Sequence, residues 1–356
     1  MKINLHTVLF CLCFSFYFSS FSASQTCSTE GDQISYGNSS WIGYVYNTSS
    51  NGARDFASYR GFVTESAESF DRNWGSSSSD QPTCATLNGE NFSIRYLMRK
   101  NYPAGVYTIT HGQDDGTRIF VGTSAVTTLA GFSSLTFQSS RWTTTGSTLH
   151  TFEWSGGDMY LVFEFNEVSG GARATFNICY NGPLQTYGST NWNGYYYNNS
   201  SLTNSNYRGQ FASSYYSSNN INDVNGSTST LPIMSTPSGV ASCGTTSTTS
   251  FSSRFLIQNN FTRGIYLFLI NTDDGVRISS NGPSPWSLNS VPTSWNIYNN
   301  FQTSSTVTAS ITTMLEGNKN LVIEQAQGGG GYAMRNRICE MAGDYRYNIF
   351  PDWNAY

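Results

Sequence analysis

Gly105-Val-Tyr-Thr-Ile-Thr-His-Gly-Gln-Asp-Asp-Gly-Thr-Arg-Ile119 recurs later in the chain as Gly264-Ile-Tyr-Leu-Phe-Leu-Ile-Asn-Thr-Asp-Asp-Gly-Val-Arg-Ile278. Each copy has an apolar run, an Asp-Asp-Gly turn and a following Arg-Ile pair, which is typical of two strands joined by a hairpin. The two Asp-Asp pairs lie 273 − 114 = 159 positions apart. A recurrence of this length indicates an internal duplication of one β-rich unit.

Other segments repeat in the same order. The segment 38–46, which contains Trp41, returns as 189–197 at an offset of 192 − 41 = 151. Tyr59-Arg-Gly61 returns as Tyr207-Arg-Gly209, at an offset of 207 − 59 = 148. Leu161-Val-Phe-Glu164 returns as Leu321-Val-Ile-Glu324, at an offset of 324 − 164 = 160. Because these offsets are nearly constant, we expect two tandem domains that differ by loop insertions and deletions.

Strand-like segments within each copy are short and are separated by turns rich in Gly, Ser and Asn, and no stretch has a sustained helical period. This pattern predicts an all-β chain of two antiparallel β-sandwiches, jelly-roll-like in form. The expected first domain covers residues 25–182 and the second covers 183–341. Asn181 to Gly188, with Pro183, is the expected linker.

The N-terminal residues 1–24 have the order of a secretory signal peptide. Lys2 precedes an apolar run from Val8 to Phe18, small residues follow, and cleavage is expected before Gln25. The run is too short to span a bilayer. We therefore expect a protein that is secreted and stays extracellular or at the cell surface, with residues 342–356 as a C-terminal tail.

The composition excludes several classes of partner. Charged residues make up 11% of the chain against about 25% in an average globular protein, and aromatic residues reach 15%. The net charge of −4 offers no basic face for nucleic acid or for an anionic membrane. So many aromatic side chains favour a folded chain over a disordered one.

Five cysteines remain after the expected cleavage, and the secretory route allows them to form disulfides. Cys84 and Cys179 are 95 positions apart, and Cys243 and Cys339 are 96 apart. This matched spacing predicts one disulfide within each domain, Cys84–Cys179 and Cys243–Cys339. Cys27 is left over, either as a free thiol or as an intermolecular crosslink.

The ordered motifs resemble the protective-antigen-type (PA14) β-sandwich domain, found in bacterial toxins and in flocculin and GLEYA adhesins. The features that carry the resemblance are Trp-x-Gly-Tyr with a later Tyr-Arg-Gly, Gly-x-Tyr before Asp-Asp-Gly-x-Arg-Ile, and an apolar strand that ends in Glu before a Gly-rich turn. The resemblance implies the β-sandwich for both copies. In the adhesin branch it further implies that the paired aspartates, often joined by a cis bond, hold a Ca²⁺ that binds two sugar hydroxyls.

This resemblance implies a site for calcium and carbohydrate in each copy. The implied carbohydrate-binding residues are Asp114, Asp115, Asn166, Asp273 and Asp274, and the implied calcium ligands are the same five with Glu167. The second copy has Ala326 and Gln327 where the first has Asn166 and Glu167, so we expect the first copy to bind Ca²⁺ better, since Ca²⁺ takes about 6–8 oxygen ligands. The alternative is that both Asp-Asp-Gly turns are purely structural.

Two further groups of side chains have a structural and a functional interpretation. Arg118 and Arg277 either contact a sugar or, as we favour, form ion pairs with Glu164 and Glu324. Trp41 and Trp192 are expected in the core. Among the Tyr runs 195–197 and 215–216 some rings are expected to be exposed and could stack on sugars, because adjacent residues of a strand face opposite ways.

Enzyme chemistry finds little support. The mature chain has only His111 and His150, and neither lies in a Ser-His-Asp or metal-ligand pattern. We expect a non-catalytic carbohydrate-binding or adhesive protein, which binds a glycan or cell-surface polysaccharide. The alternatives are a structural or protein-interaction module without a sugar site and, less favoured, a glycan-active enzyme whose paired acids are not readable from sequence.

Overall fold

The computed structural model describes residues 25, 27–75, 82–84, 87, 89–211, 220–221, 233–244, 249–329 and 334–341. Regular structure in these ranges is almost entirely β-strand, and the only helices there are two 3-10 turns, η1 (Leu129–Ser134) and η2 (Asn204–Asn206). The all-β sandwich class predicted from the sequence is confirmed. The expected signal peptide, 1–24, and the expected tail, 342–356, lie outside the described residues.

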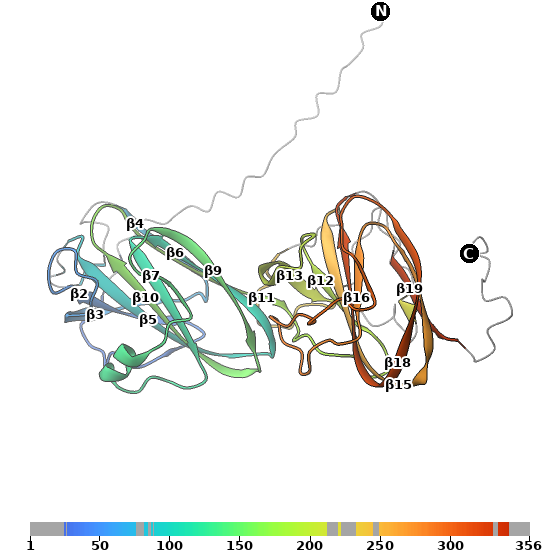
Figure 1. Cartoon of the computed structure of the whole chain (residues 1–356). Coiled ribbons are helices and arrows are strands. Elements are labelled where there is room, and N and C mark those ends of the chain that lie inside the picture. Colours follow the sequence, from blue (N-terminus) through green and yellow to red (C-terminus); the bar gives the residue numbers. More distant parts are fainter. Residues whose placement is uncertain are drawn as a thin grey trace, which may run out of the picture.

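The N-terminal half forms two facing sheets (Figure 1). The larger sheet has the order β3-β2-β5-β10-β7-β8, with β1 paired to β5, and the smaller has the order β4-β11-β6-β9. Their strands are β1 (Gly37–Asn38), β2 (Trp41–Asn47), β3 (Ser58–Glu65), β4 (Phe70–Gly75), β5 (Phe92–Tyr102), β6 (Gly105–Asp114), β7 (Gly116–Gly122), β8 (Ser139–Arg141), β9 (Gly146–Trp154), β10 (Gly157–Glu167) and β11 (Ala172–Gly182).

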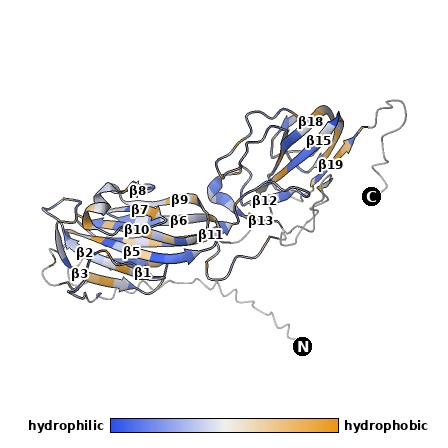
Figure 2. Cartoon of the chain, turned by 90° about the horizontal axis from the view of Figure 1, so that it is seen from below, coloured by the Kyte–Doolittle hydropathy of each residue, from blue (hydrophilic) through white to orange (hydrophobic). Residues whose placement is uncertain are grey.

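The larger sheet of this half is covered on both faces. Its inner face packs against the smaller sheet through a core that includes Trp41 and Phe163. Its outer face carries a second buried cluster of Tyr44, Tyr46, Leu97, Phe132 and Val162, to which η1 contributes Phe132. Hydrophobic and hydrophilic residues therefore intermingle along these strands instead of alternating strictly (Figure 2), as expected where both faces of a sheet are buried.

The C-terminal half repeats the strand order of the larger sheet. Its sheet runs β13-β12-β15-β18-β16-β17, with β19 paired to β15 and β14 paired to β19. The strands are β12 (Asn193–Tyr197), β13 (Tyr207–Gln210), β14 (Asn220–Ile221), β15 (Phe251–Thr272), β16 (Val276–Ser279), β17 (Tyr298–Asn300), β18 (Val307–Gln327) and β19 (Met334–Glu340). The assignment of residues 25–182 and 183–341 to two tandem domains stays a prediction.

One difference between the halves follows from a single proline. Pro103 lies between β5 and β6, where its fixed φ and missing N–H interrupt a strand. The C-terminal half has Thr262 and Arg263 at this place, and β15 continues through it with only a register shift between Phe261 and Gly264. The long pair β15–β18 therefore lies in one sheet. The corresponding strands of the N-terminal half form two pairs, β5–β10 and β6–β9, which belong to different sheets.

The segment expected to be a linker is packed between the halves, near the end of β11 (Figure 1). The Asn181 amide donates to the Tyr207 carbonyl at 2.9 Å, and Gln185 is almost fully buried. Farther along, the Leu288 backbone N–H donates to Glu153 at 2.7 Å. Residues 181–188 are thus part of the contact between the halves and not an exposed tether.

The predicted disulfides were wrong. Cys27 bonds to Cys84, with Cα atoms 4.9 Å apart, and Cys179 bonds to Cys243, with Cα atoms 4.8 Å apart, which leaves Cys339 unpaired. The cause is local pairing of the chain. The Thr83 N–H donates to the Gln25 carbonyl, which brings Cys84 to the N-terminal segment, and Tyr180 forms a parallel bridge with Ser242, which brings Cys243 beside Cys179.

This arrangement predicts which thiols matter for stability. Replacing Cys179 and Cys243 together by Ser should lower the free energy of unfolding by about 2–4 kcal/mol, because the bond closes a long loop in the unfolded chain. Cys339→Ser is the matched control and should change it by less than about 0.5 kcal/mol. Denaturant unfolding measures both. Non-reducing peptide mapping that found Cys84 joined to Cys179 would contradict the assignment.

Candidate functional site

The first Asp-Asp pair lies at one end of the N-terminal sandwich, where β6 ends at Asp114 and β7 begins at Gly116. Asp115 Oδ2 accepts hydrogen bonds from the backbone N–H groups of Val168, at 2.7 Å, and Ser169, at 3.1 Å. The Asp115 N–H donates to the Asn166 carbonyl at 3.3 Å, and the peptide bond between Asp114 and Asp115 is cis. Asp115 therefore ties the β6–β7 turn to the loop that follows β10.

Glu167 is the most unusual group of this site. Its side chain is fully buried, and neither carboxylate oxygen has a hydrogen-bond partner within the described residues. Burial, together with the negative charges of Asp115, Asp114 and Glu90, raises the pKa of Glu167 to about 9. Burial and the adjacent Asp115 also raise the pKa of Asp114. The end of the sandwich thus brings several carboxylates together, and their mutual repulsion adds to the effect of burial on Glu167.

Asn166 is buried beside this group, but its amide already has partners. Arg54 Nη1 donates to Asn166 Oδ1, and Asn166 Nδ2 donates to the Trp142 carbonyl at 3.1 Å. The oxygen expected to serve a metal or a sugar is therefore directed to a guanidinium. Asp114, Asp115 and Glu167 are the implied ligands that the fold leaves with the most oxygen atoms to offer.

The second Asp-Asp pair lies in the corresponding turn, between β15 and β16. Asp274 is buried, and its Oδ2 accepts from the Gly328 N–H at 2.6 Å. Thr306 donates to Asp273 Oδ1 at 3.4 Å, and the Gln325 amide donates to the Asp273 carbonyl at 3.2 Å. The peptide bond between these aspartates is trans.

Strand register fixes which residues of the two halves correspond. Asn166 and Glu167 pair with Ser93 and Phe92. Ala326 and Gln327 pair with Ser252 and Phe251, which lie at an offset of 252 − 93 = 159. The C-terminal turn therefore has a methyl group and an amide where the N-terminal turn has an amide and a carboxylate, as the sequence offset predicted.

The side chains of the N-terminal turn offer oxygen atoms of the kind that bind a hard metal cation. Within the described residues, no group of three or more His, Cys, Asp or Glu side chains is arranged as a metal site. An oxygen-only set with a buried carboxylate that lacks a partner nevertheless fits a hard cation such as Ca²⁺, with backbone carbonyls or water completing its shell. The C-terminal turn fits it less well, since Gln327 replaces the carboxylate.

The two arginines of the repeated motif form ion pairs, as favoured from the sequence. Arg118 donates to Glu164 and Arg277 donates to Glu324. Each glutamate is fully buried and also accepts from a second arginine, Arg95 Nε at 2.6 Å or Arg254 Nε at 2.7 Å. Sequence reasoning missed these second arginines, although their spacing of 254 − 95 = 159 matches the repeat and could have identified them.

The aromatic candidates for sugar stacking are mostly in the core. Trp41 and Trp192 are buried, as expected. The expectation that some rings of Tyr195 to Tyr197 are exposed was wrong, because all three are fully buried. The sheet face outside the sandwich is covered by Trp286, Leu288 and the segment 184–187, so the strand is enclosed on both sides. Tyr215 and Tyr216 lie outside the described residues.

Neither histidine lies beside the carboxylates. His111 is buried, its two ring nitrogens contact the hydroxyls of Thr117 and Ser139 at 2.9 and 2.8 Å, and burial lowers its pKa to about 4. Such an imidazole is neutral near pH 7 and acts as a structural hydrogen-bonding group. Of the helices described, none has the length and apolar character needed to cross a membrane.

Comparison with known proteins gives weak likenesses only. No protein-family model matches the chain, and neither does any curated protein. An anti-sigma factor domain-containing protein covers 88% of this chain and 95% of its own at 16% identity, with a TM-score of 0.29. Epithelial Adhesin 9 A domain from Candida glabrata, solved with Galβ1-3GlcNAc, covers 44% and 85% at 11% identity, with a TM-score of 0.28.

A third solved structure, the PA14 domain of the MpAFP antifreeze protein, covers 46% of this chain and 87% of its own at 19% identity, with a TM-score of 0.27. These likenesses are too weak to carry an argument about function. Any function must therefore be argued from the residues of this chain.

The pKa of Glu167 gives a test of its environment. The folded-state value of about 9 lies above the ordinary value of 4.5, so the unfolded chain ionises first and stability is lost as the pH rises toward 9. In the presence of a calcium chelator, Glu167→Gln should remove this loss and raise Tm by several degrees at pH 8, with little change at pH 4.

Gln327→Glu is the matched control, because it places a carboxylate at the corresponding position of the other half. It should lower Tm at pH 8. Thermal unfolding followed by circular dichroism at a series of pH values measures both variants. If the Tm of wild type and the Tm of Glu167→Gln change with pH in the same way, Glu167 has the same pKa in the folded and the unfolded chain, and the prediction is wrong.

Proposed function

We propose that this protein is a secreted, non-catalytic carbohydrate-binding protein of the adhesin type. The proposal rests chiefly on one observation, the buried and unpartnered carboxylate of Glu167 beside Asp114 and Asp115. Ionising this carboxyl without a partner is costly in the protein interior, and a cation that binds here would offset that cost. A hard cation held by oxygen ligands at the end of a sandwich can bind vicinal sugar hydroxyls with its remaining positions.

Calcium is the cation that we propose for this site. Asp114, Asp115 and Glu167 would hold it, and the bound ion would supply positive charge to which sugar hydroxyls can coordinate. The chain's own part is to fix the turn, since Asp115 accepts from Val168 and Ser169 and is thereby held against the loop after β10. The corresponding turn at Asp273 and Asp274 is the weaker site in this proposal.

The extracellular location is part of the same proposal. Two disulfide bonds are typical of proteins that fold outside the reducing cytosol. The expected signal peptide, the low charge and the abundance of polar loops agree with it. The resemblance of the motifs to PA14-type domains supports the adhesin branch, and the two tandem domains belong to this proposal.

The decisive experiment compares the two turns in the full mature chain. Isothermal titration with Ca²⁺ should show that Asp114→Asn with Asp115→Asn weakens binding at least tenfold, because two of the proposed carboxylate ligands lose their charge. Asp273→Asn with Asp274→Asn should weaken it much less. A glycan array with Ca²⁺ and with chelator should show glycan binding that requires Ca²⁺. This binding should be lost in Asp114→Asn with Asp115→Asn and kept in Asp273→Asn with Asp274→Asn.

Each alternative has a distinct outcome. If the wild type binds neither Ca²⁺ nor any glycan, a structural or protein-interaction module is the better description. If Asp114→Asn with Asp115→Asn unfolds the chain even in excess chelator, the turn is structural. Sugars released from a polysaccharide on incubation with the protein would establish an enzyme.

A further inference from the structure

A pocket lies on the outer face of the larger N-terminal sheet, away from the sandwich core. Its volume is about 590 Å³, within the range of small-molecule sites, about 300–1,000 Å³. The lining residues include Tyr46, Arg54, Phe56, Tyr59, Arg95 and Phe132. They come from three strands, β2, β3 and β5, from the loop before β3 and from η1, so the sheet forms the floor of the pocket and the loop and η1 form its walls.

Two tyrosine hydroxyls and an arginine of this pocket have hydrogen-bonding capacity that the protein does not use. Arg95 gives its Nε to Glu164, and within the described residues no hydrogen bond joins its two outer nitrogens to a carboxylate or amide. The guanidinium is stacked between Phe56, at 4.1 Å, and Phe132, at 4.2 Å, so its plane is fixed. The buried hydroxyls of Tyr46 and Tyr59 also lack a partner within the described ranges.

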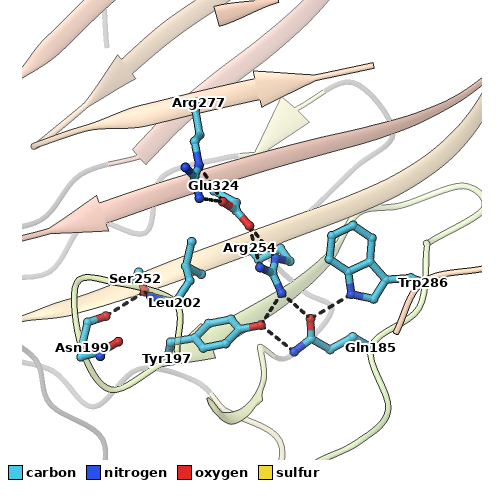
Figure 3. Close-up of polar contacts among 9 residues, drawn as sticks. All are labelled: Gln185, Tyr197, Asn199, Leu202, Ser252, Arg254, Arg277, Trp286 and Glu324. Carbon is cyan, nitrogen blue, oxygen red and sulfur yellow. Dashed lines mark hydrogen bonds and ion pairs between the residues drawn. The ribbon is translucent and has the colours of Figure 1, made fainter. Parts of the chain in front are cut away.

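In the C-terminal half, the corresponding arginine has a hydrogen-bond acceptor supplied by the chain itself (Figure 3). Arg254, the counterpart of Arg95, gives its outer Nη1 to Gln185 Oε1 at 3.1 Å and to the Tyr197 hydroxyl at 2.6 Å. The Trp286 indole donates to the same Gln185 oxygen at 3.3 Å. A buried amide of the chain itself is therefore the acceptor for this arginine.

Within the described residues of the N-terminal half, no amide accepts a hydrogen bond from Arg95. Gly37 and Gly188 form corresponding parallel pairs with the neighbouring strand, at an offset of 188 − 37 = 151, so the counterpart of Gln185 is Ile34. An isoleucine cannot accept a hydrogen bond. In the C-terminal half, Arg254 and Tyr197 both bond to Gln185. Their counterparts in the N-terminal half, Arg95 and Tyr46, line the pocket instead.

We propose that this pocket binds the carboxylate of an acidic sugar, such as a hexuronic acid. A carboxylate is a planar acceptor that matches the fork of a guanidinium, and Arg54, Arg95 and Arg118 outnumber the single carboxylate of the lining, Asp55. Phe56 and Phe132 offer apolar walls to the sugar ring. Arg54 also donates to Asn166 beside Asp115, so a glycan could extend from this pocket toward the proposed calcium site.

This site is independent of calcium and goes beyond the proposed function. Titration of the full mature chain with D-galacturonate and D-glucuronate in excess chelator should show binding that weakens as salt is raised. D-galactose and D-glucose, which lack the carboxylate, should bind at least tenfold more weakly. Asp114→Asn with Asp115→Asn should leave uronate binding intact, so the failure of either proposal can be recognised separately.

Two variants and a matched control locate the site. Tyr46→Phe should weaken uronate binding about fivefold to tenfold with little change in Tm, because the buried hydroxyl that it removes has no hydrogen-bond partner of normal geometry in the protein. Ala57→Trp should block the pocket. Tyr197→Phe, the corresponding change in the other half, should leave uronate binding unchanged and lower Tm, because that hydroxyl bonds to Arg254 and Gln185.

Three results would overturn the proposal. One is equal binding of uronates and neutral sugars. Another is binding of acetate as tightly as uronate, which would indicate a general anion site without a sugar. The last is uronate binding that survives both Tyr46→Phe and Ala57→Trp in folded protein, because the ligand would then bind elsewhere.

Discussion

A fully buried glutamate held by two arginines is the interaction on which both halves depend. Glu164 lies on β10 and accepts from Arg95 on β5 and Arg118 on β7, so one carboxylate joins the three central strands of the sheet. Glu324 does the same for β15, β18 and β16. Removing one partner of a buried pair typically costs about 3–5 kcal/mol, because the remaining charge cannot be solvated. Because both arginines must reach the same carboxylate, the register of the three strands around each glutamate is fixed.

Aromatic residues complete the same arrangement. Arg118 is stacked near Phe137 and Trp142, and Arg277 is stacked near Trp295 and Phe301. Each guanidinium is thereby shielded from water on its flat faces, and the N–H groups of its edge donate to the glutamate. The outer face of each sheet becomes a second core, which explains how a chain with few charges can bury several of them. Around this ion pair, the two halves differ in how the remaining edge of the inner arginine is bonded.

Much of the fold could be predicted because its signals are local and repeated. The Asp-Asp-Gly turns, the strands around them and the ion pairs of Arg118 and Arg277 lie within short, ordered motifs. The disulfides could not be predicted from spacing, because Cys84 and Cys179 have nearly the same separation as Cys243 and Cys339 although neither pair bonds. Their true partners depend on Thr83 meeting Gln25 in one case and on β11 meeting the segment before Cys243 in the other. The burial of Tyr195 to Tyr197 and the role of Asn166 likewise depend on distant segments, so no local pattern reveals them.

The Cys179–Cys243 bond has a mechanical consequence. It joins the last strand of the N-terminal half to Cys243, between β14 and β15, and its cysteines are 64 positions apart in the sequence. If the protein is stretched by its ends, as happens to a molecule that holds a surface in flowing liquid, the load passes across the sulfur atoms and not through β12 and β13. A length of about 210–230 Å of extended chain, at about 3.3–3.6 Å per residue, is therefore withheld from unravelling until the bond is reduced.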